Sequence, residues 1–303
     1  MKKLYFNQDM WSIRIIKNKE YNNLNKCIFA SKITAKDVTD VKAIFVADPF
    51  IIKNKDKWYL FYEIYKENGR KGVIGYSESY DGEHWNYGQV ILEEEYHLSY
   101  PYVIRDNDDI YMIPEGANGG SIKLYKAKNF PVSWEMKKEI IYGSYWDPSV
   151  FYYDGIWWMF ALTNNPEKFS LALFYSDSLE GEWKEHPKSP IIINNPKITR
   201  PAGRVFNCDK LIRYTQDCSD NYGKLVKAFE IVKLTKTDYK EKEIGVIIEN
   251  SKKEGSWNKD GMHNIDIEKF DDDNYIIAVD GYYYKKTNKV ISKIKNFIYK
   301  VVK

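Results

Sequence analysis

Residues 146–162 read WDPSVFYYDGIWWMFAL, in which Asp147 and Pro148 precede two short aromatic runs separated by Asp154-Gly155. Short apolar and aromatic runs bounded by turn residues are typical of β-strands, and an Asp-Gly pair between two of them indicates a hairpin. The segment therefore predicts two antiparallel strands. It leaves open whether Asp147 only starts a strand or also carries chemistry.

The same pattern occurs three more times along the chain. The matching segments are ADPFIIKNKDKWYLFYE (47–63), SYPYVIRDNDDIYMIPE (99–115) and RPAGRVFNCDKLIRYTQ (200–216). Their prolines, at 49, 101, 148 and 201, are 52, 47 and 53 residues apart. A third apolar run and a closing aromatic follow in each unit, so each unit has room for four strands. A period of about 50 residues with four strands per repeat is the signature of a β-propeller.

The sequence therefore predicts an all-β fold, a five-bladed β-propeller with four-stranded blades in a single domain spanning 1–303. The blades are expected at 41–95, 96–143, 144–194, 195–250 and 251–303. The fifth unit, GMHNIDIEKFDDDNYIIAVDGYYY (261–284), supplies two strands and part of a third. We expect the N-terminal segment 3–17 to add the missing outer strand and close the ring. An irregular β-sandwich or two β domains is the alternative, but it explains no repeat.

Turn residues lie where such strands need them. Asp56-Lys57, Asn107-Asp108 and Asp154-Gly155 separate the first and second strands of three blades. The large aromatics Trp58, Trp157 and Trp158 are expected to pack between blades, because a propeller buries both faces of each sheet.

Composition excludes several classes of protein. The chain has 46 Lys and Arg against 43 Asp and Glu, a net charge of +3, and its basic residues are scattered apart from a tail from Lys285 to Lys303. We expect that tail to be solvated, and nothing indicates a nucleic-acid partner. We expect no signal peptide, because polar residues interrupt the N-terminal segment early, and no apolar run approaches about 18 residues. A cytoplasmic location without a transmembrane segment is expected, and peripheral membrane association stays open.

The three cysteines, Cys27, Cys208 and Cys218, have no metal-binding spacing. Reduced thiols are expected, with no disulfide framework, no zinc site and no cofactor. His263 lies where it could help to hold a cation at the axis, but a single histidine without further ligand spacing is a weak signal. We therefore expect no metal.

Candidate site residues come from the positions that line the central funnel. The first strand of each blade lines it, so the residues before the prolines form a ring at one mouth: Asp48, Tyr100, Asp147 and Arg200, with His263 or Asn264 as the counterpart in blade five. An Asp-Pro pair often only starts a strand. Two such pairs at equivalent sites favour function, since Tyr100 and Arg200 show that the fold does not require Asp there.

Further polar residues end the second strands near the same rim. Glu63 and Glu115 are either solvated charges or members of the site, with Glu115 in MIPEG the better candidate. Arg200 and Arg204 flank a small-residue turn; their guanidinium groups suit a carboxylate or phosphate, or pair with Asp48 or Asp147. Gln216 suits the hydroxyl groups of a sugar.

At ADPF, YPYVI, WDPSVF and RPAGR the sequence resembles the five-bladed propeller superfamily of arabinanases, invertases and levansucrases, which comprises glycoside hydrolase families 43, 32 and 68. The strings HLSYPYVI, YMIPEG, RPAGRVF and YTQDCSDNYGK resemble a narrower branch. That branch is the propeller domain at the N-terminus of plant glucosamine inositolphosphorylceramide transferases and in bacterial proteins of surface-polysaccharide clusters.

The resemblance to the hydrolases implies roles for two aspartates. Asp48 would serve as general base or nucleophile, and Asp147 would hold the substrate and tune a neighbouring pKa. The hydrolases place their acid, a glutamate, at the start of blade four, where this chain has Arg200. Glycosidic cleavage needs a proton donor. Either Glu115 or Glu63 supplies the proton, or a phosphate leaving group departs beside Arg200 or Arg204 without one.

The leading hypothesis is a carbohydrate-active enzyme that acts at a glycosyl bond in the funnel, by glycosyl transfer in cell-surface polysaccharide or glycolipid synthesis. Its partner would be a sugar donor or glycan, nucleotide- or lipid-linked donors included. The alternatives are a glycoside hydrolase of the family 43 type, with Asp48 as base and Glu115 as acid, and a non-catalytic glycan-binding propeller. The expected catalytic residues are Asp48, Asp147 and Glu115, and the expected substrate-binding residues are Glu63, Tyr100, Arg200, Arg204, Gln216 and His263.

Overall fold

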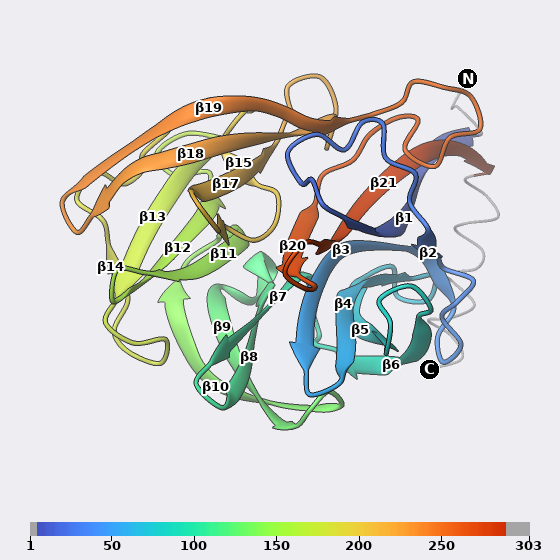
Figure 1. Ribbon diagram of the computed structural model, residues 1–303, viewed down its shortest axis with the longest axis horizontal. Coiled ribbons are helices and arrows are strands. Elements are labelled where there is room, and N and C mark those ends of the chain that lie inside the picture. The colour runs from blue at the N-terminus through green and yellow to red at the C-terminus, as the bar shows by residue number, and fades with distance from the viewer. Residues whose placement is uncertain (1–4, 289–303) are drawn as a thin grey trace.

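The short aromatic runs form strands, and five sheets of these strands surround a common axis (Figure 1). The computed structural model describes residues 5–288. In that part of the chain the one helix is the three-residue 3-10 turn η1 (Ala117–Gly119), so no helix there is long enough to cross a membrane. The predicted all-β, five-bladed propeller is confirmed.

The first three blades follow one plan, in which four consecutive strands pair antiparallel from the inside outward. Blade one contains β3 (Ala43–Asn54), β4 (Lys57–Lys66), β5 (Gly72–Ser79) and β6 (Asn86–Leu92). Blade two contains β7 (Ser99–Asp106), β8 (Asp109–Glu115), β9 (Ser121–Asn129) and β10 (Ser133–Tyr142). Blade three contains β11 (Trp146–Tyr153), β12 (Ile156–Thr163), β13 (Ser170–Ser176) and β14 (Lys184–Glu185).

Blade four has a divided inner strand. Two short strands, β15 (Arg200–Pro201) and β16 (Phe206–Asn207), both pair with β17 (Leu211–Gln216). Next to β17 the sheet continues with β18 (Leu225–Thr235) and β19 (Asp238–Glu249). The interruption coincides with Ala202-Gly203, the small residues of RPAGR. Because of this interruption, Arg200 does not have the strand pairing of the residues before proline in the first three blades.

Blade five joins the two ends of the chain. Its inner strands are β20 (Ile265–Lys269) and β21 (Tyr275–Asn288), and its outer strands are β1 (Tyr5–Asn18) and β2 (Ser31–Ile33). β1 pairs with β21 along its whole length, from Tyr5 opposite Asn288 to Asn18 opposite Tyr275. The predicted closure by the N-terminal segment is confirmed. The segment supplies an outer strand, β1, as expected, and β2 adds a further short strand outside it.

Some expectations for blade five concern residues at the ends of the chain. Residues 289–303 of the expected fifth blade, the same part of the basic tail, and the first two residues of the expected strand 3–17 lie outside the described residues. Within the described part the long β1–β21 ladder accounts for closure. Such pairing joins the two ends of the chain within one blade.

In blades one to three, a two-residue turn joins the first strand to the second. Asn107-Asp108 and Asp154-Gly155 form the turns of blades two and three as expected, and Asn107 and Asp154 have φ angles of 54° and 52°. In blade one the turn lies at Lys55-Asp56, one residue before the expected pair. Lys55 takes the left-handed conformation there, with φ 54°, although its side chain gives no signal for it.

The core lies between the blades. Trp58 stacks on Phe270 of blade five, with ring centroids 5.4 Å apart. Trp157 belongs to an apolar cluster shared by blades one to three, and Trp158 to one shared by blades three and four. The prediction that these tryptophans pack between blades is confirmed. Packing of this kind fixes neighbouring inner strands against each other, which sets the geometry at the axis.

Candidate active site

The residue before the proline has a left-handed backbone in each of the first three blades. The φ angles are 54° at Asp48, 45° at Tyr100 and 53° at Asp147, a region that residues with side chains rarely adopt. At each of them the inner strand carries one extra residue relative to its partner strand. A bulge of this kind re-aims a side chain, so the repeat turns three equivalent side chains toward neighbouring blades.

Blade four departs from this pattern. Arg200 pairs regularly with Gln216, and Pro201 with Thr215, so the bulge is displaced to the residues that follow. Gly203 has φ 122°, and a Cβ there would lie 1.7 Å from the backbone oxygen of Ile265. The expectation that Arg200 is the equivalent of Asp48 is therefore wrong in register. Its side chain nevertheless reaches the same place, as its contacts show.

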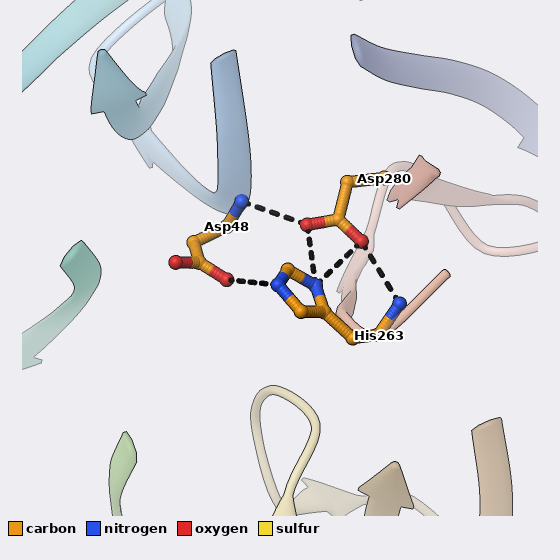
Figure 2. A group of neighbouring side chains, drawn as sticks. All are labelled: Asp48, His263 and Asp280. Carbon is orange, nitrogen blue, oxygen red and sulfur yellow. Dashed lines mark hydrogen bonds and ion pairs between the residues drawn. The ribbon is translucent and has the colours of Figure 1, made fainter. Parts of the chain in front are cut away.

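Asp48, His263 and Asp280 form a continuous chain of contacts (Figure 2). His263 Nδ1 lies 2.9 and 2.8 Å from the two carboxylate oxygens of Asp280, and its Nε2 lies 3.6 Å from Asp48 Oδ1. The backbone N–H of Asp48 donates to Asp280 at 2.8 Å. The Tyr100 N–H donates to Asp48 Oδ2 at 3.1 Å. The imidazole is thus held between two carboxyl groups from blades one and five.

Burial strongly affects the pKa values of Asp48 and His263. It raises the pKa of Asp48 to about 7, with the charge of His263 opposing and those of Asp280 and Asp147 adding to the rise. Burial alone would lower the pKa of His263, but Asp280 and Asp48 outweigh it, and that pKa lies above its ordinary value. A carboxyl group that exchanges its proton near neutral pH can act as a base in catalysis.

The same three residues are the group of described side chains most suited to a cation. Their ligand atoms lie within 4.8 Å of one another, and two carboxylates with one imidazole suit several divalent metals. A metal would need an unprotonated ring nitrogen of His263, whereas Asp280 and Asp48 outweigh burial and raise the pKa of His263, which favours its protonated form.

The raised pKa of Asp48 makes a prediction for stability. Asp48 titrates near pH 4 when unfolded and near 7 when folded. Its contribution to the free energy of unfolding is therefore fully present below pH 4 and is lost as pH rises through about 7. Asp48→Asn removes that loss, so relative to the wild type the variant should gain stability from pH 5 to pH 8. Urea unfolding at both pH values measures this, and an unchanged difference would contradict the raised pKa.

Asp147 forms the second half of the site. Arg200 donates to it from Nε at 2.5 Å and from Nη2 at 3.3 Å, and Gln216 Nε2 donates to the same carboxylate at 3.2 Å. The Asp147 carboxylate is buried, whereas the Arg200 side chain keeps 17% exposure. We name the six residues Asp48, Asp147, Arg200, Gln216, His263 and Asp280 the mouth cluster. The charge of Asp147 acts on both Asp48 and His263. This interaction links the two halves of the mouth cluster.

Tyr222 adds an aromatic surface to the mouth cluster. Its ring lies 4.9 Å from the Arg200 guanidinium carbon and meets His263 edge-on at 5.1 Å. Tyr222 is 42% exposed. Its loop is fixed, because Asn221 donates to the Tyr282 hydroxyl at 2.7 Å. On the other side of the imidazole, Trp11 stacks on His263 at 4.0 Å.

The two strand-end glutamates differ. Glu115 is satisfied at both oxygens: the Ser99 hydroxyl donates to Oε2 at 2.7 Å and the Ala117 N–H to Oε1 at 2.8 Å. Glu63 is also buried, but its Oε1 has no hydrogen-bond partner among the described residues. Burial, with the charges of Asp48 and Glu115, raises the pKa of Glu63 well above its ordinary value.

Tyr100 is a structural residue in this structure. Its side chain is 1% exposed, its hydroxyl lies 2.7 Å from Ser149 Oγ, and it accepts from the Gly203 N–H at 2.6 Å. Those contacts tie blade two to blades three and four. The expectation that its ring flanks a ligand does not fit this burial; its backbone N–H is the part that serves the mouth cluster.

Arg204 also lies elsewhere than expected. It donates from Nε to Asp266 at 2.8 Å and from Nη2 to the carbonyl oxygens of Ile51 and Val103, both at 3.1 Å. These partners lie further along the inner strands than Asp48 and Tyr100, and within residues 5–288 no hydrogen bond or ion pair joins Arg204 to the mouth cluster. The expectation that Arg204 binds substrate is therefore not supported by its position, which is that of a cross-blade brace.

Sequence reasoning missed four residues around the site: Trp11, His97, Tyr222 and Asp280. Asp280 had a signal, since a charged residue ends the apolar run YIIAV in the second strand of blade five, as Glu63 does in blade one. Blade five has no proline to anchor the comparison. Tyr222 lies within YTQDCSDNYGK, a loop whose placement depends on contacts with blade five.

The sequence places this propeller in a family. Residues 7–282 match the family described as glucosamine inositolphosphorylceramide transferase 1, N-terminal. The chain belongs to this family. The suspected resemblance to that branch is confirmed.

Two plant members show how the chain relates to longer proteins. It is 38% identical over 248 residues to glucosamine inositolphosphorylceramide transferase 1 of Oryza sativa subsp. japonica, covering 78% of this chain and 33% of that protein. With the Arabidopsis thaliana protein of the same name the identity is 36% over 245 residues, covering 78% and 32%. The chain spans about a third of the length of these relatives.

Solved structures of glycoside hydrolases share the fold. An exo-1,5-alpha-L-arabinanase from a bovine ruminal metagenomic library is 16% identical with a TM-score of 0.55, covering 82% of this chain and 95% of that one. A Bacillus subtilis arabinanase is 15% identical with a TM-score of 0.54, covering 77% and 93%. At such identity the likeness shows the propeller architecture alone.

Proposed function

We propose that this propeller acts at a glycosyl bond in the mouth cluster and transfers a glycosyl unit to an acceptor hydroxyl in glycolipid or cell-surface polysaccharide synthesis. The donor is a nucleotide- or lipid-linked sugar. The transferase names of the two plant relatives support the reaction class, although the matched region is only about a third of each of those proteins. The residues support it independently.

The single observation that carries the proposal is the state of Asp48. Its carboxyl group lies on a strained bulge, faces His263 at 3.6 Å, and has a pKa of about 7. Backbone strain of about 1–3 kcal/mol per residue persists where the surroundings enforce it, and it is often found at functional sites. A base whose pKa matches the working pH is the group that proton abstraction from a hydroxyl requires.

The proposed step balances as follows. The acceptor hydroxyl gives its proton to the Asp48 carboxylate while its oxygen bonds to the anomeric carbon of the donor. The bond from that carbon to the leaving oxygen breaks, and its electron pair stays with the leaving group. The partly exposed Arg200 guanidinium lies beside this charge. Asp147 and Gln216 hold sugar hydroxyls with the hydrogen-bonding capacity that their mutual contact leaves free.

A glycoside hydrolase is the second candidate, and Glu63 favours it. In that reaction water replaces the acceptor, and a carboxylic acid protonates the leaving oxygen. Glu63 has a buried, unpaired oxygen and a raised pKa, whereas Glu115 has both oxygens occupied by donors. The expected hydrolase acid therefore moves from Glu115 to Glu63.

A product screen separates these functions. The protein is incubated with nucleotide-linked sugars, lipid-linked sugars and oligosaccharides, with and without an inositol-phosphate lipid as acceptor, and products are weighed by mass spectrometry. Acceptor mass increased by one sugar residue supports transfer. Release of free sugar regardless of acceptor supports hydrolysis. Saturable binding of a saccharide without any product would overturn both and leave a glycan-binding propeller.

Tyr222 makes a prediction for substrate affinity. Because its exposed ring lies beside Arg200, Tyr222→Ala should raise KM for the sugar by about 3- to 10-fold, the effect of losing one aromatic contact, with a smaller change in kcat. Steady-state kinetics measure the two constants. Tyr142→Ala, at an even more exposed tyrosine on the outer strand β10, is the matched control and should change neither. A fall in kcat alone for Tyr222→Ala would contradict a binding role.

A further inference from the structure

Glu63 is a buried acid that the mouth cluster does not use. It lies on β4 opposite Ala47, the residue before Asp48. Its Oε1 is buried and accepts no hydrogen bond among residues 5–288. A carboxylate with an unpaired buried oxygen is unfavourable, and such a group relieves the cost by keeping its proton. The residue is therefore arranged to be a neutral carboxylic acid.

His97 is the neighbour that faces this oxygen. The backbone N–H of Gly72 donates to His97 Nδ1 at 2.8 Å, so Nδ1 is an acceptor and the ring proton of neutral His97 is on Nε2. Nε2 lies 3.5 Å from Glu63 Oε1. Burial lowers the pKa of His97, which keeps the ring neutral although its side chain is 33% exposed. A neutral N–H donor thus faces a neutral acid.

Gly72 makes this approach possible. A Cβ at Gly72 would lie 2.6 Å from Glu63 Oε1, 2.8 Å from His97 Cε1 and 2.2 Å from the backbone oxygen of Leu98. Only a residue without a side chain lets the backbone N–H reach the imidazole here. The tautomer of His97 is therefore set by the backbone of β5 and not by a charged partner.

We propose that Glu63 is the proton donor of the site and that His97 is the positioning residue that holds it for donation. This inference rests on the second candidate of the proposed function, the glycoside hydrolase, because in the transfer step the leaving group departs beside Arg200 without a proton. In the step, the Glu63 O–H proton passes to the leaving oxygen as its bond to the anomeric carbon breaks, and Glu63 becomes a carboxylate. The Nε2–H of His97 then stabilises that charge. Asp48 has meanwhile gained a proton from the attacking water, whose oxygen bonds to the anomeric carbon, so one proton passed from Asp48 to Glu63 through solvent restores both groups.

The environment of Glu63 explains why it differs from Glu115. Carboxyl groups of Asp48, Glu115, Asp280 and Asp147 act on Glu63 and disfavour its charge, and His97 is the titratable group in contact with it. Burial raises the pKa of Glu115 as well, but a backbone N–H and a hydroxyl donate to it and oppose that rise, whereas Glu63 Oε1 has no such donor among the described residues. Two acids at equivalent strand ends are thereby assigned different roles, Glu63 as acid and Glu115 as a cap for the loop that contains η1.

The first experiment needs no substrate. The full chain, labelled with 13C at glutamate carboxyl carbons and with 15N at histidine, is titrated by NMR as wild type, Glu63→Gln and His97→Leu. One glutamate signal should stay at its protonated position at pH 7 and vanish in Glu63→Gln. One histidine should be neutral with its proton on Nε2 and vanish in His97→Leu. Finding Glu63 ionised at pH 6, or His97 protonated at pH 7, would overturn the inference whatever the protein does.

The second experiment tests the catalytic role with the sugar found in the product screen. Glu63→Gln should lower turnover about 10²–10⁴-fold for a donor with an alkyl leaving group, and less than about 10-fold for a dinitrophenyl leaving group, which departs without a proton. His97→Leu should shift the alkaline limb of the pH profile, and His97→Gln, which keeps an N–H donor, should partly restore it. Glu78→Gln, at a Lys57-paired glutamate on the same blade, is the control.

The outcomes separate the two proposals. Equal losses for both leaving groups in Glu63→Gln would contradict the acid role while leaving glycosyl chemistry intact. If no sugar turns over in wild type, the proposed function fails, and the acid role fails with it. The NMR result then still decides whether Glu63 is a neutral acid held by His97.

Discussion

Asp48→Asn is expected to lower turnover of the sugar donor by about 10²–10⁴-fold, the range for loss of a general base. Asn has the shape of Asp and accepts the Tyr100 N–H through its side-chain oxygen, so the contact at 3.1 Å can persist. Asn also tolerates the left-handed backbone found at this position. The variant therefore removes the proton acceptor and preserves the bulge. Steady-state kinetics on the donor identified by the product screen measure the loss.

The pH profile sharpens this test. Because the pKa of Asp48 is about 7 and the base must be ionised, kcat/KM of the wild type should rise as pH increases through about 7. Residual activity of Asp48→Asn should lack that rise. Asp154→Asn is a matched control, since Asp154 is an exposed turn residue with φ 52°. Full turnover in Asp48→Asn would exclude the role of base.

The repeat in the sequence was sufficient to predict the fold. Each unit starts with a proline followed by two aromatic runs and a turn between them, a local pattern that predicts two strands. The period of about 50 residues then predicts how these strands are grouped into blades. Lys55 and the three-residue β2 were missed for a physical reason. A left-handed lysine and a very short outer strand are imposed by the neighbouring chain, and local propensity contains no signal for either.

Part of the mouth cluster could be predicted from the sequence. Asp48 and Asp147 were named because an Asp-Pro pair recurs at equivalent positions of the repeat. Arg200 was placed one register position away, since the sequence does not show that blade four moves its bulge to Ala202-Gly203. Asp280 was missed because its partner His263 is 17 residues away in sequence and no proline marks blade five. Contacts between blades decide these positions, and they are not local.

The brace around Arg204 illustrates the same point for stability. A charged side chain in a small-residue turn is ordinarily read as exposed, yet this guanidinium touches three other blades. It pairs with Asp266 of blade five and donates to the carbonyl oxygens of Ile51 in blade one and Val103 in blade two. Asp266 in turn accepts the Ile51 N–H at 2.6 Å. The inner strands of four blades thus meet at the Arg204–Asp266 pair, and Glu268 lies 3.5 Å from the same guanidinium.

Breaking that pair from one side should lower the free energy of unfolding by about 3–5 kcal/mol, because a buried charge is left without its partner. We expect this for Asp266→Asn and for Arg204→Met, measured as a fall in the urea midpoint. The double variant Arg204→Met/Asp266→Leu should lose less than the sum, since it removes both members of the buried pair and leaves only Glu268, which is 33% exposed, without Arg204. Lys210→Met breaks the exposed pair with Glu230 and should cost under about 1 kcal/mol. Equal, small losses in the free energy of unfolding for all four variants would show that the brace does not stabilise the ring. An Arg204→Met variant that keeps its stability but loses sugar binding would show instead that Arg204 binds substrate.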